Sequence, residues 1–169
     1  MKLYNLQEQR IEDLEYVRNK EGAILYTSFF DKVQAKSLGY LIVVEEPLPA
    51  LESEFKKIVQ VKEIKDDTYS IFYKIEDKTL EELILLFKER TQQFLDEKAI
   101  AKGYDNILSA CSYAGFDNPF RAEGEKFGKW RSEVWSKGYA ILKDITEGRR
   151  KLPKSFKEIL DELPILEEI

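Results

Sequence analysis

The N-terminal half of the chain alternates short apolar runs with polar, turn-forming residues. Apolar residues at helical spacing over 11–17 predict a short helix, and residues 29–36 predict a second one that ends at Gly39. Residues 2–4 and 40–44 are short apolar runs that are typical of strands. This half is therefore expected to mix short helices with short strands.

A β-hairpin is predicted next along the chain. Residues 55–64 and 68–75 alternate apolar and polar side chains with the period of two that half-buried strands show, and both are rich in β-branched and aromatic residues. Lys65, Asp66 and Asp67 separate them as a short polar turn. The two segments are expected to pair as neighbouring strands.

The longest apolar pattern predicts a helix over residues 80–102. Thr79 and Glu82 form a capping-box pair at its start, in which each side chain accepts a hydrogen bond from the other residue's backbone N–H. Apolar residues repeat along it at i, i+3, i+4 and i+7, and Leu85 and Leu86 widen the stripe. Such a helix packs on two sides, either inside its own domain or against another chain. A homo-oligomer through this helix is therefore a further expectation.

Helices are also predicted for the remaining residues. A helical hairpin is expected over 105–147, with Gly148 ending its second helix, and a short helix is expected over 155–163. The predicted fold class is α+β. A small N-terminal α/β part with a β-hairpin (1–78) is followed by the long helix and an all-helical C-terminal domain (79–169).

The net charge, the absence of histidine and the single cysteine limit which partners and which kinds of catalytic or metal site the chain can have. Charged residues make up 35% of the chain and leave a net charge of −5, which disfavours nucleic acid and anionic membranes as partners. Histidine is absent, so Ser-His-Asp and Cys-His nucleophile pairs and most zinc and copper sites are excluded. The single cysteine, Cys111, is expected to be a small buried residue. No catalytic, cofactor-binding or metal-binding residue is predicted.

Small residues and aromatics crowd together between residues 103 and 135. Gly124 and Gly128 lie four residues apart on a predicted helix, so they are expected to allow the close approach of another helix or of aromatic side chains. Trp130 falls on the apolar stripe of that helix and is expected in the core. The segment is thus expected to form a compact helical hairpin.

Four residues of this region and Tyr139, which follows it, form a candidate interaction surface: Phe116, Asp117, Arg131, Trp135 and Tyr139. Trp135 and Tyr139 share a helix face at the edge of the apolar stripe. Exposed aromatics stack on sugars, and Trp, Tyr and Arg anchor protein interfaces. Core packing is the commonest role for such aromatics, a protein interface comes next, and sugar binding comes last. An ion pair of Arg131 with Asp105 or Asp117 is a further alternative.

The same region carries a distinctive sequence: GYDNILSACSYAG at 103–115, then Asn118-Pro119-Phe120, Ala122-Glu123-Gly124, Trp130-Arg131 and Val134-Trp135. It closely resembles a domain of small proteins from tailed phages and prophages that are described as tail, tail-fibre or tail-fibre-assembly proteins. The resemblance extends from about Gly39 onward, and it is strongest over 103–135. The sequence departs from the family at Phe116-Asp117, where small residues or proline are usual.

The resemblance implies a non-enzymatic tail protein, either a structural component or a chaperone-like assembly factor, that binds a tail-fibre or tail protein. The alternative is a binding module of a tail fibre or baseplate that recognises a host-surface glycan through aromatic side chains. No catalytic residues or cofactors come with the family. Both hypotheses place the chain in the host bacterial cytoplasm during assembly, and a structural component would remain in the virion tail.

Overall fold

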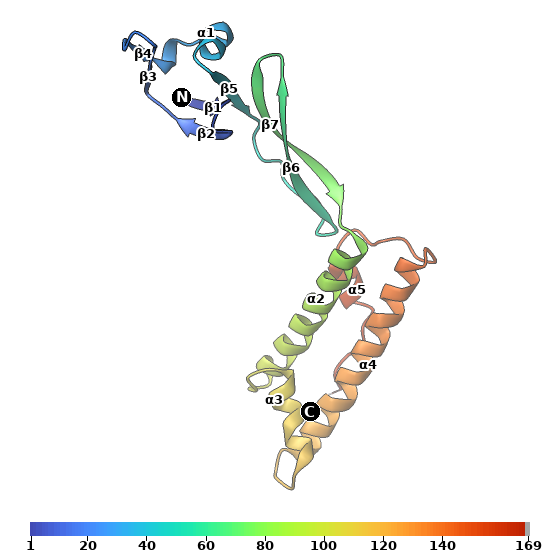
Figure 1. Cartoon of the computed structure of the whole chain (residues 1–169). Coiled ribbons are helices and arrows are strands. Elements are labelled where there is room, and N and C mark those ends of the chain that lie inside the picture. Colours follow the sequence, from blue (N-terminus) through green and yellow to red (C-terminus); the bar gives the residue numbers. More distant parts are fainter. Residues whose placement is uncertain (168–169) are drawn as a thin grey trace. The chain divides into compact units, whose positions relative to one another are not determined.

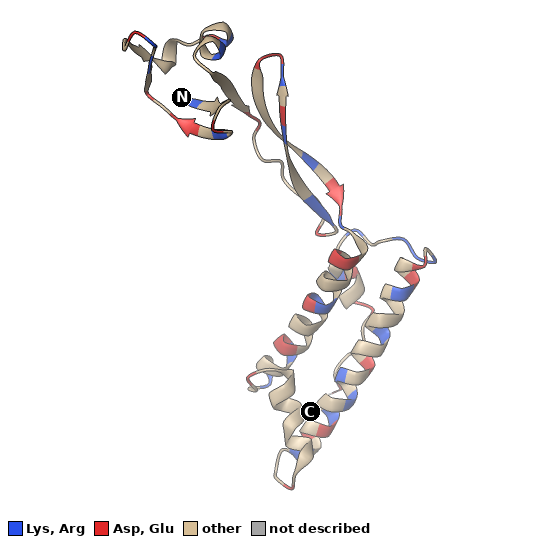
Figure 2. Cartoon of the chain, in the orientation of Figure 1, with Lys and Arg blue, Asp and Glu red and all other residues tan. Residues whose placement is uncertain are grey.

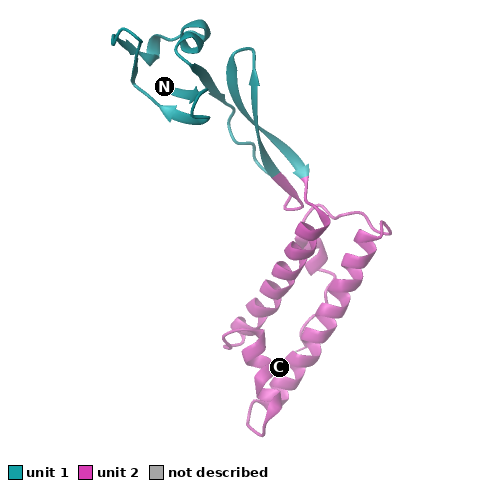
Figure 3. Cartoon of the chain, viewed as in Figure 1, with its two compact units in different colours: residues 1–51, 58–76 teal, residues 52–57, 77–169 magenta. Residues whose placement is uncertain are grey.

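The computed structural model of the chain describes residues 1–167 and has a mixed α+β fold, with an N-terminal sheet followed by a long helix and later helices (Figure 1). The chain divides into two compact units (Figure 3). The first, here called the sheet unit, contains residues 1–51 and 58–76. The second, here called the helical unit, contains residues 52–57 together with the chain from Asp77 onward. The coarse α+β prediction is confirmed.

The sheet unit is built on a five-stranded sheet whose strand order is β2-β1-β5-β7-β6. Its strands are β1 (Lys2–Asn5), β2 (Arg10–Asp13), β5 (Tyr40–Glu45), β6 (Lys56–Lys65) and β7 (Thr68–Asp77). β1 pairs with β2 and with β5 in antiparallel fashion, whereas β5 and β7 are parallel. A separate two-stranded sheet is formed by β3 (Tyr16–Arg18) and β4 (Ile24–Tyr26).

The predicted helix over 11–17 is wrong, because this segment supplies β2 and β3. Ile11 pairs with Tyr4 of β1, and Val17 pairs with Leu25 of β4. The carbonyl of Leu14, between the two strands, accepts hydrogen bonds from the N-terminal ammonium and from the Thr27 hydroxyl. A helix of seven residues is marginal by itself, so these pairings with neighbouring strands decide the structure.

The other expected elements of the first half are present. Helix α1 (Lys32–Ser37) begins three residues later than predicted, because a capping box between Asp31 and Gln34 fixes its start and a 3-10 turn, η1 (Thr27–Phe29), precedes it. Gly39 ends it with a φ of +86°.

The β-hairpin is also confirmed. Asp66 and Asp67 have φ values of +48° and +57°, and these left-handed conformations match the right-handed twist of the strands that they join. The core of this sheet is small. It contains Leu41, Tyr69 and Ile71, with the Tyr4 ring stacked on Tyr69 at 4.0 Å.

Within residues 1–167 the helical unit contains four helices and a 3-10 turn. They are α2 (Leu80–Ala101), α3 (Ile107–Ser112), η2 (Tyr113–Gly115), α4 (Arg121–Thr146) and α5 (Phe156–Leu160). The predicted capping box is present at the start of α2, where the Thr79 hydroxyl accepts from the Glu82 N–H and the Glu82 carboxylate accepts from the Thr79 N–H. α2 and α4 lie side by side over much of their length, and α3 packs on both (Figure 1).

A large apolar core joins these helices. Phe127, Trp130 and Val134 of α4 belong to the same buried cluster as the inward residues of α2 and α5. The core position expected for Trp130 is confirmed. α2 also contacts α5, where Phe87 meets the ring of Phe156, whereas Leu85, which widens the apolar stripe, is 56% exposed. Self-association through α2 stays a prediction.

The helical unit includes a segment that the sequence does not associate with it. Phe55 is buried in the helical core, where its ring lies 6.5 Å from that of Phe156. The Lys57 ammonium contacts both carboxylate oxygens of Glu82 at 2.8 and 2.9 Å. Residues 52–57 therefore complete this unit, which is not built from helices alone.

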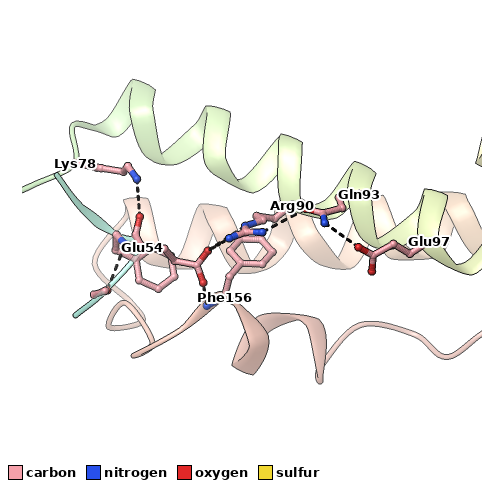
Figure 4. A network of polar contacts seen from close by, with 8 residues as sticks. Glu54, Lys78, Arg90, Gln93, Glu97 and Phe156 are labelled. Carbon is pink, nitrogen blue, oxygen red and sulfur yellow. Dashed lines mark hydrogen bonds and ion pairs between the residues drawn. The ribbon is translucent and has the colours of Figure 1, made fainter. Parts of the chain in front are cut away.

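Glu54 holds that segment against α2 and α5 (Figure 4). One of its carboxylate oxygens accepts from the backbone N–H of Phe156 at 2.8 Å, at the start of α5, where the N-cap side chain makes no hydrogen bond. The other accepts from the Arg90 guanidinium at 2.8 and 3.0 Å. The Lys78 ammonium donates to the Glu54 carbonyl at 2.6 Å. Glu54 thus caps α5 from outside the helix.

Substituting Glu54 with alanine is expected to lower the free energy of unfolding by about 1–2 kcal/mol, since it removes the acceptor at the α5 N-terminus and the carboxylate that pairs with Arg90. The matched control is Glu133→Ala. The Glu133 carboxylate meets Lys129 at 3.9 Å on an exposed helix face, so its loss is expected to cost less than about 0.5 kcal/mol. Urea unfolding of both variants measures the difference. Equal midpoints would contradict the capping role.

Candidate functional site

The loop between α3 and α4 lies at one end of the helical unit (Figure 1) and is held by a single side chain. The Asn118 amide nitrogen donates to the carbonyls of Tyr113 and Phe116, each at 2.8 Å. Its oxygen accepts from the Phe120 N–H at 2.8 Å. Three bonds from one amide fix the conformation of the loop. Asn106 caps the preceding helix in the same way, because its side chain accepts from the Ser109 N–H.

Three rings gather on this loop. Tyr113 lies between Phe116, whose ring centre is 6.2 Å away, and Phe120, at 5.6 Å in an edge-to-face arrangement. Phe116 is 56% exposed and Phe120 is 50% exposed, although the loop itself is well tied down. We call Tyr113, Phe116 and Phe120 the aromatic tip. It is a rigid apolar surface presented to solvent.

The tip is placed by the close approach of α3 and α4. A Cβ atom on Gly124 would lie 2.5 Å from the Ala114 nitrogen and 2.9 Å from the Tyr113 carbonyl carbon. Only glycine therefore fits at this contact, as expected. The same expectation is wrong for Gly128, where an added Cβ would meet no atom within 4 Å. The turn of α4 that carries Gly124 packs on η2, whereas Gly128 faces open space.

Tyr104 connects the tip with the core. Its ring lies edge-on to Tyr113 at 5.6 Å and to Phe127 at 5.4 Å. Its hydroxyl donates to the Glu123 carboxylate at 2.7 Å. Burial, followed by this hydrogen bond, raises the pKa of Tyr104 to about 12. The proton therefore stays on Tyr104 at any pH near neutrality, and the bond is present.

The raised pKa makes a testable contribution to stability. Unfolded tyrosine titrates near pH ~10, so between about pH 10 and 12 the unfolded chain loses this proton while the folded chain keeps it. The stabilisation is thus complete below pH ~10 and is lost as the pH rises toward 12. The difference in unfolding free energy between the wild type and Tyr104→Phe is expected to shrink over that range. A difference that stayed constant from pH 9 to pH ~11.5 would contradict the assignment.

Arg131 lies apart from the tip, on the face of α4 toward Cys111. Its Nε is buried and has no hydrogen-bond partner among residues 1–167, and within this range Arg131 forms no ion pair with Asp105 or Asp117. Burial raises the pKa of the Cys111 thiol, and the positive charge of Arg131 opposes that effect only in part. Cys111 is therefore a half-buried thiol that is protonated near neutral pH, close to the expected small buried residue.

Trp135 and Tyr139 stack on each other, with ring centres 5.5 Å apart and planes inclined by 28°. Trp135 is half-buried against the helical core, whereas Tyr139 is 51% exposed. The depression beside them, which Phe87 and Thr91 also line, has a volume of about 10 Å³. That space holds no more than a single water molecule. The pair is therefore mainly an edge of the core.

The five predicted interaction residues do not form one surface. Phe116 and Asp117 lie on the tip loop, whereas Trp135 follows the start of α4 by 14 residues, which corresponds to about 21 Å along the helix. Sequence reasoning found Phe116 but missed Tyr113 and Phe120 as its neighbours. The signal for them is Asn118, an amide placed to hydrogen-bond the backbone on both sides of Pro119.

Both α2 and α4 carry Lys and Arg as well as Asp and Glu side chains along their length (Figure 2). Within residues 1–167 no cluster of three or more Cys, Asp or Glu side chains could hold a metal ion. In the same range no helix has the length and apolar character needed to cross a membrane.

Comparison of the chain with family models, curated proteins and solved structures gives no match.

Proposed function

We propose that this chain is a non-enzymatic tail protein of a phage or prophage that binds a tail-fibre or tail protein through the aromatic tip. The observation that carries the proposal is the exposure of Phe116 and Phe120 on a loop that Asn118 holds rigid. Monomeric proteins rarely keep a fixed cluster of large apolar side chains in water without a binding role.

The aromatic tip has two properties that favour protein binding. A few aromatic anchors supply most of the binding energy of a protein interface. A surface that is already ordered loses little conformational entropy on binding, and the three Asn118 hydrogen bonds supply that order here. The tip therefore combines the residue types and the rigidity of a binding hot spot.

The phage assignment rests on the sequence resemblance, which is strongest over residues 103–135 and thus over the tip and its supports. Asn106, Gly124 and Asn118 all belong to this segment, and each of them shapes the tip. In this proposal the helical unit, residues 52–57 included, acts as one partner-binding domain. The protein works in the host cytoplasm during assembly, as an assembly factor or as a component that stays in the tail.

Affinity purification from cells that produce the particles tests the proposal. The tagged wild type is expected to retain a tail-fibre or tail protein, and the double variant Phe116→Ser, Phe120→Ser is expected to lose it while keeping its melting temperature. Tyr139→Ser is the matched control, since Tyr139 is 51% exposed on the same unit but lies outside the tip. Retention of the partner by the double variant would overturn the tip as the binding site.

Mass spectrometry of purified particles then separates the two forms of the proposal. Peptides of this chain in stoichiometric amounts would identify a structural component. Their absence from particles, with abundant protein in the producing cells, would identify an assembly factor. If the affinity purification of the tagged protein retained only cellular proteins unrelated to the tail, the phage assignment would be contradicted.

A further inference from the structure

The sheet unit contains a second feature that the aromatic tip does not explain. A groove with a volume of about 450 Å³ lies between β4, η1 and α1. Leu25, Phe30 and Leu38 are half-buried within it. Tyr26 and Phe29 also line it but are largely exposed, and Phe29 is 82% exposed. The volume is within the range of small-ligand sites.

The lining carries no Lys, Arg, Asp or Glu, although such residues make up 35% of the chain. Its polar groups are the amides of Asn19 and Gln34, the Ser37 hydroxyl and the Tyr26 phenol. A charged ligand would therefore find no counter-ion among the residues that line the groove. The lining selects an uncharged ligand that can form hydrogen bonds.

Two amide nitrogens are free to donate to such a ligand. The Asn19 oxygen accepts from the backbone N–H groups of Glu21 and Ala23, and the Gln34 oxygen accepts from that of Asp31. These bonds fix which end of each amide is the oxygen. Neither amide nitrogen donates a hydrogen bond within the described part of the chain, residues 1–167.

We propose that this groove binds an uncharged carbohydrate chain. The faces of aromatic rings attract the weakly positive C–H groups of a sugar, and the free amides of Asn19 and Gln34 donate to its hydroxyls. The groove belongs to the sheet unit, so the inference does not rest on the function proposed for the aromatic tip.

Two substitutions separate the binding role from a structural one. Phe29→Ala removes a ring that is 82% exposed, and Gln34→Glu removes the free donor while keeping the oxygen that caps α1. Both variants are expected to keep the melting temperature of the wild type. Each is expected to weaken carbohydrate binding by about tenfold. Val33→Ala is the control, since Val33 is exposed but does not line the groove.

The probe is a surface printed with neutral and with acidic bacterial polysaccharides, and the protein is the full chain. Binding to one or more neutral polysaccharides, with loss in both groove variants and no change in Val33→Ala, is the expected result. The double variant Phe116→Ser, Phe120→Ser should bind as the wild type does, so failure of one proposal is distinguishable from failure of the other. Absence of binding to every neutral polysaccharide, equal binding to acidic ones, or binding that survives both groove substitutions would overturn the inference.

Discussion

Trp130→Ala is expected to lower the free energy of unfolding of the helical unit by about 3–5 kcal/mol. Trp130 is 3% exposed, and its ring lies 5.8 Å from Phe94 of α2 and 6.4 Å from Phe127 of α4. Its indole N–H donates to the Pro164 carbonyl at 2.8 Å, which ties the segment after α5 to α4. The substitution would leave a cavity and an unpaired carbonyl at the same place.

The variant Trp130→Phe separates the loss of the hydrogen bond to Pro164 from the loss of the aromatic ring. It keeps an aromatic ring in the core and removes the hydrogen bond to Pro164, so its expected loss is smaller, about 1–2 kcal/mol. Urea unfolding followed by far-UV circular dichroism measures both variants. An unchanged midpoint in Trp130→Ala would show that the side chain is exposed and that the helical core is described incorrectly.

Gly124→Ala is expected to be the most damaging change of a single methyl group, with a loss of about 3 kcal/mol or more. The added Cβ would lie 2.5 and 2.9 Å from atoms of the backbone, which cannot rotate away as the end of a side chain can. α3 and η2 would have to move from α4, and the aromatic tip would move with them. Binding of the partner is therefore expected to weaken together with stability.

Gly128→Ala is the matched control on the same helix. No atom lies within 4 Å of the added Cβ, and alanine favours the helix interior over glycine by about 0.5–1 kcal/mol. The variant is expected to be as stable as the wild type or more stable. Similar destabilisation of both variants in thermal and urea unfolding would contradict the close contact between α4 and η2.

Elements with local signals could be predicted from the sequence. The capping box of Thr79 and Glu82 marks the start of α2, and the acidic pair Asp66-Asp67 marks the hairpin turn. Both signals act within three residues of the chain. The helix expected over 11–17 was wrong, because its apolar spacing fits two short strands equally well and only pairing with β1 and β4 decides between them.

Contacts between distant residues could not be predicted in this way. Glu54 precedes Phe156 by 102 residues, and nothing near either residue indicates that one caps the helix of the other. The predicted interaction surface likewise combined residues that are close in the sequence but distant in the structure. Trp135 and Tyr139 are near Phe116 in the sequence, but Trp135 lies 14 residues beyond the start of α4 and is therefore distant from the tip loop in the structure. The rings that do meet Phe116 are those that the Asn118 loop brings together.

The central claim is that the aromatic tip contacts a tail protein, and photocrosslinking from position 116 tests it most directly. A photoreactive phenylalanine analogue replaces Phe116 in one sample and Tyr139 in a second, and both proteins are produced in cells that assemble the particles. The account predicts a crosslink from position 116 to a tail-fibre or tail protein and none from position 139. A crosslink from position 139 alone, or none from position 116 in cells that assemble complete particles, would contradict it.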